Sequence, residues 1–134
     1  KDKYLKGTGY NGAPADTDDC LEHGCLMRAG HCVRTVHAEA NVVLQSDYID
    51  RQGATIYTTD LPCYECCKLI VNSGIKRVVY ERDYPRHHYY DKLLCDQSGV
   101  ALDHIEVPGD GIPDIDDNVK VFSVDFDETK RVEE

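Results

Sequence analysis

Two short motifs constrain the fold of this sequence more than any other feature. His37-Ala38-Glu39 opens one run of helix-forming residues, and Pro62-Cys63-Tyr64-Glu65-Cys66 opens a second. Imidazole and thiolate groups are zinc ligands, and three protein ligands leave the fourth tetrahedral position open to water, as in catalytic sites. We therefore predict a zinc site made by His37, Cys63 and Cys66, which requires the starts of the two helices to meet.

Glu39 stands two residues from a predicted ligand, where its carboxylate is placed to reach a zinc-activated water without binding the metal. This position predicts a general acid and base that shuttles protons. The alternative is that Cys63 and Cys66 are half of a structural zinc ribbon, with Glu39 on a solvated helix face. A ribbon needs a second cysteine pair of similar spacing, so the combined motifs favour catalysis.

Alternation of helical and β-rich runs predicts an α/β class with parallel strands joined by right-handed crossovers. Thr35 is a candidate cap for the first helix, and Gly74 is a candidate stop for the second. The predicted helices cover residues 35–45, 63–73 and 89–97, and the predicted strands cover 4–10, 54–59, 76–80, 100–107 and 120–126. We expect residues 13–34, between the first predicted strand and the first predicted helix, to form an irregular loop. Residues 108–118 are expected to be a linker.

The 134 residues, 41% of them hydrophobic, suffice for one core. We expect residues 1–107 to form the zinc-dependent domain and 108–134 to be its acidic extension, with three Lys/Arg against nine Asp/Glu. The net charge of -10 disfavours a nucleic-acid partner and favours a small substrate. A membrane span and a signal peptide are not apparent, so we predict a cytoplasmic location.

Several longer stretches resemble one family, the deoxycytidylate (dCMP) deaminases of the cytidine deaminase superfamily. The matching pieces are Gly9-Tyr10-Asn11-Gly12, Cys32-Val33-Arg34-Thr35-Val36-His37-Ala38-Glu39-Ala40-Asn41, Ile56-Tyr57-Thr58-Thr59-Asp60-Leu61-Pro62-Cys63 and Ser73-Gly74-Ile75-Lys76-Arg77-Val78-Val79-Tyr80. The H-x-E and P-C-x-x-C pair is shared by zinc deaminases generally. The Gly-Tyr-Asn-Gly and Arg-Thr-Val-His-Ala-Glu pieces are similar to the dCMP enzymes in particular.

The resemblance implies a three-layer fold with a mixed β-sheet, and hydrolysis of dCMP to dUMP and ammonia. Asn11 matches the family position that bonds the sugar, and the backbone of Ala38 the one that contacts the base. Thr59 and Tyr84 are further substrate candidates. Candidate phosphate or effector contacts are Gly12, Arg28, Arg34 and the segment 82–88. The resemblance also implies a homohexamer activated by dCTP and inhibited by dTTP, with Mg²⁺ accompanying a bound triphosphate.

Five ligand-type side chains in the predicted loop are similar in placement to a second, structural zinc site of some family members. Cys20, Cys25 and His31 are the preferred ligands, with His23 and Cys32 as further candidates. Free thiols are an equally open interpretation. Cys67 and Cys95, inside predicted helices, are expected to be buried and inert.

Family members normally begin with a helix and a strand that precede the segment equivalent to residues 4–10. Both are missing from this sequence, so we expect the sheet to lack that strand and the chain to be incomplete at its start. Two other functions stay open: deamination of a different base, nucleoside or nucleotide, and a zinc-stabilised interaction module without catalysis.

Overall fold

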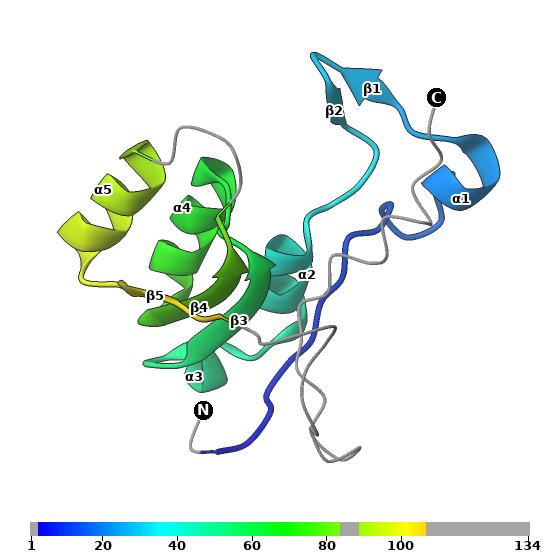
Figure 1. Ribbon diagram of the computed structural model, residues 1–134. Coiled ribbons are helices and arrows are strands. Elements are labelled where there is room, and N and C mark those ends of the chain that lie inside the picture. The colour runs from blue at the N-terminus through cyan, green and yellow to red at the C-terminus, as the bar shows by residue number, and fades with distance from the viewer. Residues whose placement is uncertain (1–2, 84–88, 107–134) are drawn as a thin grey trace.

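A computed structural model of the protein describes residues 3–83 and 89–106. Within these ranges the chain forms short helices and two separate sheets (Figure 1). The helices are α1 (Cys20–His23), α2 (Ala38–Gln45), α3 (Tyr48–Arg51), α4 (Tyr64–Ser73) and α5 (Tyr89–Ser98). The strands are β1 (Met27–Arg28), β2 (His31–Cys32), β3 (Thr55–Asp60), β4 (Arg77–Arg82) and β5 (Ala101–His104).

The larger sheet has the order β3-β4-β5, and both pairings are parallel, which confirms the predicted α/β class. Helices α4 and α5 are the crossovers between its strands, so they run antiparallel to the strands. Helix α2 packs beside α4, and α4 beside α5. The N-terminal ends of α4 and α5 therefore lie at the same sheet edge, where the strands end.

The core lies between this sheet and the helices. It contains Ile56, Val78 and Tyr80 from the strands, together with Cys67, Ile70 and Cys95 from the helices. The two cysteines, expected to be buried thiols, are fully enclosed at 0% exposure. On the opposite face of the sheet, Tyr57 is half-exposed and Arg77 pairs with Asp103. Helices α2, α4 and α5 thus cover one face of the sheet.

The strand predicted over residues 4–10 is wrong for most of that range, because residues 5–9 run without regular secondary structure along α2. Two glycines allow this close approach. A side chain at Gly9 would overlap the carbonyl oxygen of Ala38 and come within 2.7 Å of the backbone nitrogen of Val42. A side chain at Gly7 would press on Ser46 and Val42. The segment packs against a helix instead of pairing in the sheet.

The predicted loop 13–34 contains a helical turn and a two-stranded ribbon that the sequence pattern did not indicate. Asp19 caps α1 through its side chain, and β1 pairs with β2 in antiparallel register, Met27 opposite Cys32. Helix α3 is a further element outside the predicted set. The predicted Tyr84 site, the segment 84–88, the linker 108–118, the strand 120–126 and the acidic extension lie outside the described residues.

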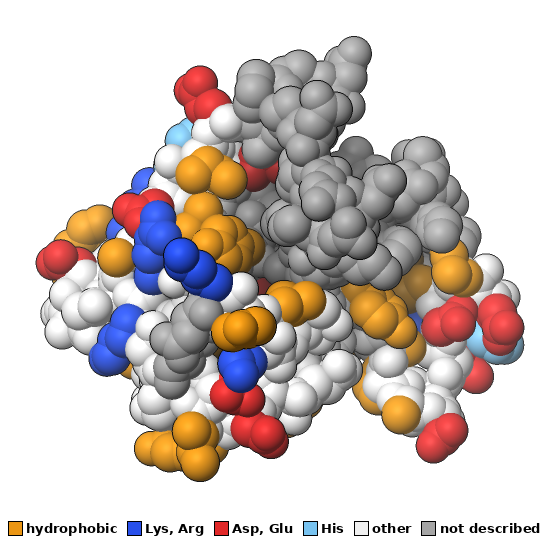
Figure 2. Space-filling view, turned by 90° about the horizontal axis from the view of Figure 1, so that it is seen from below, with side chains coloured by type: hydrophobic (Ala, Val, Ile, Leu, Met, Phe, Trp, Pro, Cys, Tyr) orange, Lys and Arg blue, Asp and Glu red, His pale blue; other side chains and the backbone are white. Residues whose placement is uncertain are grey.

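In the part of the chain that the structure describes, no helix combines the length and apolar character needed to cross a bilayer. Figure 2 shows positively and negatively charged side chains interspersed over one face of the molecule. The described side chains on that face therefore form no continuous basic surface of the kind that polynucleotides require.

Candidate metal centre

Three predicted ligands converge in the structure. The Nδ1 atom of His37 lies 3.5 Å from the Sγ atom of Cys63 and 3.4 Å from that of Cys66. All three donor atoms lie within 4.8 Å of one another. A tetrahedral zinc with ordinary Zn–S and Zn–N bonds separates a sulfur from a nitrogen ligand by about 3.6 Å. The distances and the donor set therefore fit a zinc ion.

Local helix structure brings the ligands together. His37 is the N-cap residue of α2, and Cys63 is the N-cap residue of α4. Both adopt the extended backbone expected at a cap, and neither side chain makes a capping hydrogen bond. The prediction that Thr35 caps the first helix is therefore wrong, since the helix begins at Ala38. Each ligand lies at the N-terminal end of its helix. The positive end of the α4 dipole there favours the thiolate form of Cys63.

The two cysteines of the centre differ in acidity. A hydrogen bond from the Cys66 thiol is the main cause that lowers the pKa of Cys63 to about 3, and His37 and the backbone N–H of Cys66 add to it against the effect of burial. The pKa of Cys66 is raised, first by the same thiol–thiol hydrogen bond and then by burial and by the charge of Glu39. Without metal, Cys63 is the thiolate and Cys66 keeps its proton.

Glu39 lies in the first turn of α2, beside the three ligands. The Oε2 atom of Glu39 lies 3.8 Å from the Sγ atom of Cys66. Its carboxylate is outside the group of donor atoms that could hold the metal. This position suits a residue that exchanges protons with a ligand in the open coordination site.

Asn11 contacts the same helix start. Its Oδ1 atom accepts the backbone N–H of Ala38 at 2.7 Å, so this part of the backbone that the resemblance assigns to the base contact is used within the protein here. Gly12 forms an antiparallel bridge with Val36, and its N–H donates to the Val36 carbonyl instead of facing a phosphate. Thr59 lies near the end of β3, at the sheet edge that carries the centre.

The predicted phosphate-binding arginines are dispersed. Arg34 is largely buried, and its guanidinium donates to the backbone carbonyl of Asp18 at 3.3 Å, so it anchors the loop. Arg28 is exposed on the β1–β2 ribbon. Arg82 forms a two-point ion pair with Asp60, at 2.9 and 3.3 Å, which joins the ends of β4 and β3. Sequence reasoning missed that pair because a 22-residue separation carries no local signal.

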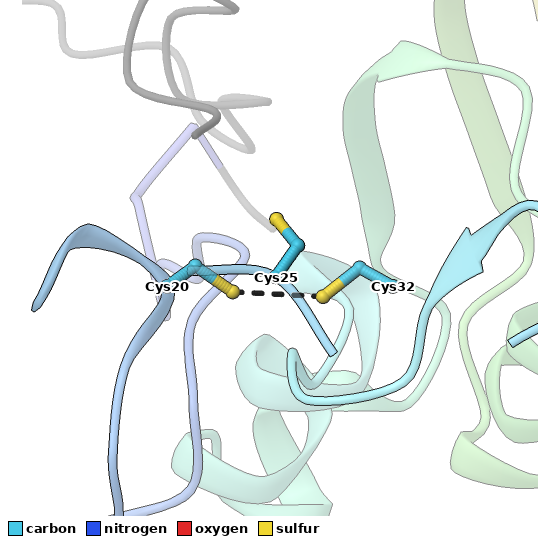
Figure 3. Close-up of side chains that lie close together, drawn as sticks. All are labelled: Cys20, Cys25 and Cys32. Atoms are coloured by element: carbon cyan, nitrogen blue, oxygen red, sulfur yellow. Dashed lines mark hydrogen bonds between the residues drawn. The ribbon is translucent and has the colours of Figure 1, made fainter. Parts of the chain in front are cut away.

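A second group of ligand-type side chains lies in the loop. The Sγ atoms of Cys20, Cys25 and Cys32 are within 4.8 Å of one another, and those of Cys20 and Cys32 are 3.5 Å apart. Figure 3 shows these two sulfur atoms facing each other, with Cys25 beside the line between them. Two of the preferred ligands, Cys20 and Cys25, belong to this group; its third member is Cys32, a further candidate, and the preferred His31 is outside it.

The thiols of this three-cysteine cluster also differ. Burial and hydrogen bonds with Cys32 and Cys25 raise the pKa of Cys20 to about 12. Partial burial alone would raise the pKa of Cys32, but the backbone N–H groups of Arg34 and Thr35 lead the contacts that lower it to about 6. Cys32 is therefore largely a thiolate at neutral pH, as the start of metal binding requires.

Residues 1–82 match the sequence model of the cytidine and deoxycytidylate deaminase zinc-binding region. This match covers more than half of the chain and includes His37, Glu39, Cys63 and Cys66. The chain belongs to the cytidine and deoxycytidylate deaminase family, as its motifs predict.

Individual relatives show which members of the family this chain is similar to. The chain is 45% identical over 97 residues to the deoxycytidylate deaminase of Mycobacterium phage D29, an alignment that covers 62% of this chain and 73% of the relative. It is 43% identical over 109 residues to ComE operon protein 2 of Bacillus subtilis, covering 80% of this chain and 57% of that protein. The chain spans 57–60% of the length of several curated relatives that it matches.

A solved structure shares the fold. The dCMP deaminase of cyanophage S-TIM5, crystallised with dCMP and dUMP, superposes with a TM-score of 0.65 at 26% identity. The superposition covers 78% of this chain and 76% of that one. The fold is thus that of the cytidine deaminases.

Proposed function

We propose that this chain carries the catalytic centre of a zinc-dependent dCMP deaminase. The observation that carries the proposal is the convergence of His37, Cys63 and Cys66 with Glu39 beside them. Relatives of this chain carry the name deoxycytidylate deaminase, and the cyanophage structure holds both dCMP and dUMP.

His37, Cys63 and Cys66 would hold a zinc ion, which would supply Lewis-acid activation of water. Glu39 would accept one proton of that water as the oxygen bonds to C4 of the cytosine ring, and would deliver it to N3. Glu39 would then take the second proton of the same oxygen and pass it to the amino group as the C4–N bond breaks, so that the oxygen remains on C4 as a carbonyl. Water is consumed, and dUMP and ammonia leave.

Substrate placement extends the proposal to Asn11, Ala38, Thr59 and Tyr84. The Asn11 oxygen accepts the Ala38 N–H, and its amide N–H groups are suited to bond a sugar hydroxyl. For the Ala38 N–H to reach the base, the pyrimidine oxygen must share or displace the Asn11 oxygen. Gly12, Arg28 and Arg34 stay predictions for phosphate or effector contacts.

We also propose that Cys20, Cys25 and Cys32 hold a second, structural zinc. Three soft sulfur donors at mutual contact distance suit zinc, and a bound ion would order a loop with few buried residues. Metal analysis separates this proposal from free thiols: close to two zinc ions per chain supports the second site, and close to one contradicts it.

Regulation and assembly are carried over from the resemblance alone. We propose activation by dCTP with Mg²⁺, inhibition by dTTP, a homohexamer and a cytoplasmic location, in a reaction that supplies dUMP for thymidylate synthesis. Assays with and without each nucleotide, and the mass of the assembly in solution, test these points.

The central experiment compares ammonia release from dCMP, cytidine, dCTP and guanine. We expect dCMP to be turned over fastest. No turnover of dCMP together with turnover of another substrate would transfer the proposal to a different deaminase, and no turnover of any substrate by the zinc-loaded protein would favour an interaction module.

A further inference from the structure

The start of α2 has an unusual arrangement of its cap. The first N–H groups of a helix have no partners within the helix, and the N-cap side chain usually accepts one of them. At α2 the N-cap residue is His37, whose ring faces the sulfur atoms of Cys63 and Cys66 and makes no capping bond. A metal ligand in this position cannot also cap its helix.

Asn11 supplies the missing acceptor from a distant part of the chain. Its Oδ1 atom accepts the N–H of Ala38, the first residue of α2, at 2.7 Å. Ala38 is 3% exposed, so water has little access to replace this bond. The bond therefore fixes the backbone between His37 and Glu39, the two residues on which the centre depends.

Asn11 is itself held in place on both sides. Its neighbour Gly12 exchanges two backbone hydrogen bonds with Val36, at 3.2 and 2.7 Å. On the other side, the carbonyl of Tyr10 accepts the Asn41 side chain at 2.9 Å. The acceptor is thus presented by an anchored segment.

We propose that Asn11 is a positioning residue for the zinc centre, because it holds the first turn of α2 so that His37 aims at the two sulfur atoms. This role is separate from the sugar contact that the family resemblance implies, and it rests on the proposed zinc site. Residues that orient metal ligands typically change metal affinity by about 10–100-fold when replaced.

Zinc competition with a chromophoric chelator, without substrate, tests the role. We expect Asn11→Ala to weaken zinc binding at this centre about tenfold. Asn11→Asp keeps an acceptor oxygen and should stay within a few-fold of the wild type. Asn41→Ala is the matched control, because it removes a hydrogen bond between the same segment and the same helix without touching the first turn. Cys63→Ser lacks one ligand of this centre, so the zinc release that changes in this variant belongs to this centre.

Unchanged zinc affinity in Asn11→Ala would overturn the inference, and so would an Asn11→Asp protein that binds zinc as weakly as Asn11→Ala. If Asn11→Ala does not fold, the zinc affinities of Asn11→Asp and Asn41→Ala decide, because the inference requires both variants to retain zinc. Loss of zinc in Asn11→Ala without any dCMP turnover by the wild type supports the inference while contradicting the proposed reaction. Turnover of dCMP by the wild type, with unchanged zinc affinity in Asn11→Ala, supports the proposed reaction while contradicting the inference.

Discussion

The Sγ atom of Cys66 lies 3.8 Å from a carboxylate oxygen of Glu39, although 27 residues separate them. The contact joins the first turn of α2 to the first turn of α4. It places a proton acceptor beside a metal ligand without making it a ligand.

Replacing Glu39 by Gln should leave zinc in place and reduce turnover of dCMP by about 10²–10⁴-fold, because the amide keeps the shape but cannot accept a proton. Zinc content and ammonia release measure the two effects. Glu65→Gln is the control: Glu65 occupies the first turn of α4 and pairs with Lys68 at 2.7 Å on the surface. Equal losses in both variants would argue against a proton shuttle at Glu39.

Zinc affinity should rise with pH. Cys63, with its pKa lowered to about 3, is already a thiolate near neutrality, whereas Cys66, with a raised pKa, must release its proton when metal binds. One proton per zinc corresponds to about a tenfold gain in apparent affinity per pH unit. Chelator competition between about pH 7 and 8, where an unperturbed imidazole is neutral, measures the slope. A flat profile would contradict the protonated Cys66.

Cys32→Ser should remove one zinc ion per chain, whereas His31→Ala should leave the zinc content unchanged. The reason is that Cys32 lies with Cys20 and Cys25, and His31 is outside that group. Elemental analysis of the purified proteins gives the ratio directly. The opposite pattern would restore His31 as the third ligand.

In metal-free protein, Cys32 should be alkylated before Cys20 at neutral pH. The pKa of Cys32 is lowered to about 6 and that of Cys20 raised to about 12, so the thiolate resides on Cys32. Mass spectrometry of peptides after brief iodoacetamide treatment measures the order, and bound zinc should protect both. Cys67 and Cys95, fully buried, should stay unmodified throughout.

Gly9→Ala should lower the free energy of unfolding by about 1–3 kcal/mol, because the new methyl group overlaps backbone atoms of α2 that have no room to move. Gly12→Ala is a milder control, since its methyl group would meet only the Tyr10 ring, at 3.2 Å. Urea unfolding of the zinc-loaded proteins provides the comparison. Similar losses in both variants would indicate that the contact with α2 is not the cause.

Sequence patterns predict the α/β half of the molecule well, because local signals decide it. The predicted strand 54–59 is shifted from β3 by one residue at each end, and the predicted helix 63–73 differs from α4 by one residue at its start. Gly74 ends α4 in a left-handed conformation with φ of 92°, as its position predicts. The ligands His37 and Cys63 could be predicted for the same reason, since each begins a helix.

The choice between His31 and Cys32 could not be made from sequence. The two are neighbours on β2, where successive side chains point to opposite faces. Only one of them can face Cys20 and Cys25, and the register of a two-residue strand is set by its pairing with β1. The strand predicted over residues 4–10 is wrong for a related reason. The sequence pattern predicts an extended chain, but it does not indicate whether a strand or a helix lies beside that chain.

The strand order of the larger sheet has a consequence for how the chain folds. In β3-β4-β5, neighbours in space are also consecutive strands in the chain. Each parallel pairing still joins residues 22 or 24 positions apart, because a helix lies between the strands, so the sheet should form together with the packing of α4 and α5. The bond between Asn11 and Ala38 spans 27 residues and closes a loop of similar length. The ligands His37 and Cys63 are 26 positions apart and begin different helices, so the metal centre should be complete only after α2 and α4 have packed, and zinc should slow unfolding more than it accelerates folding.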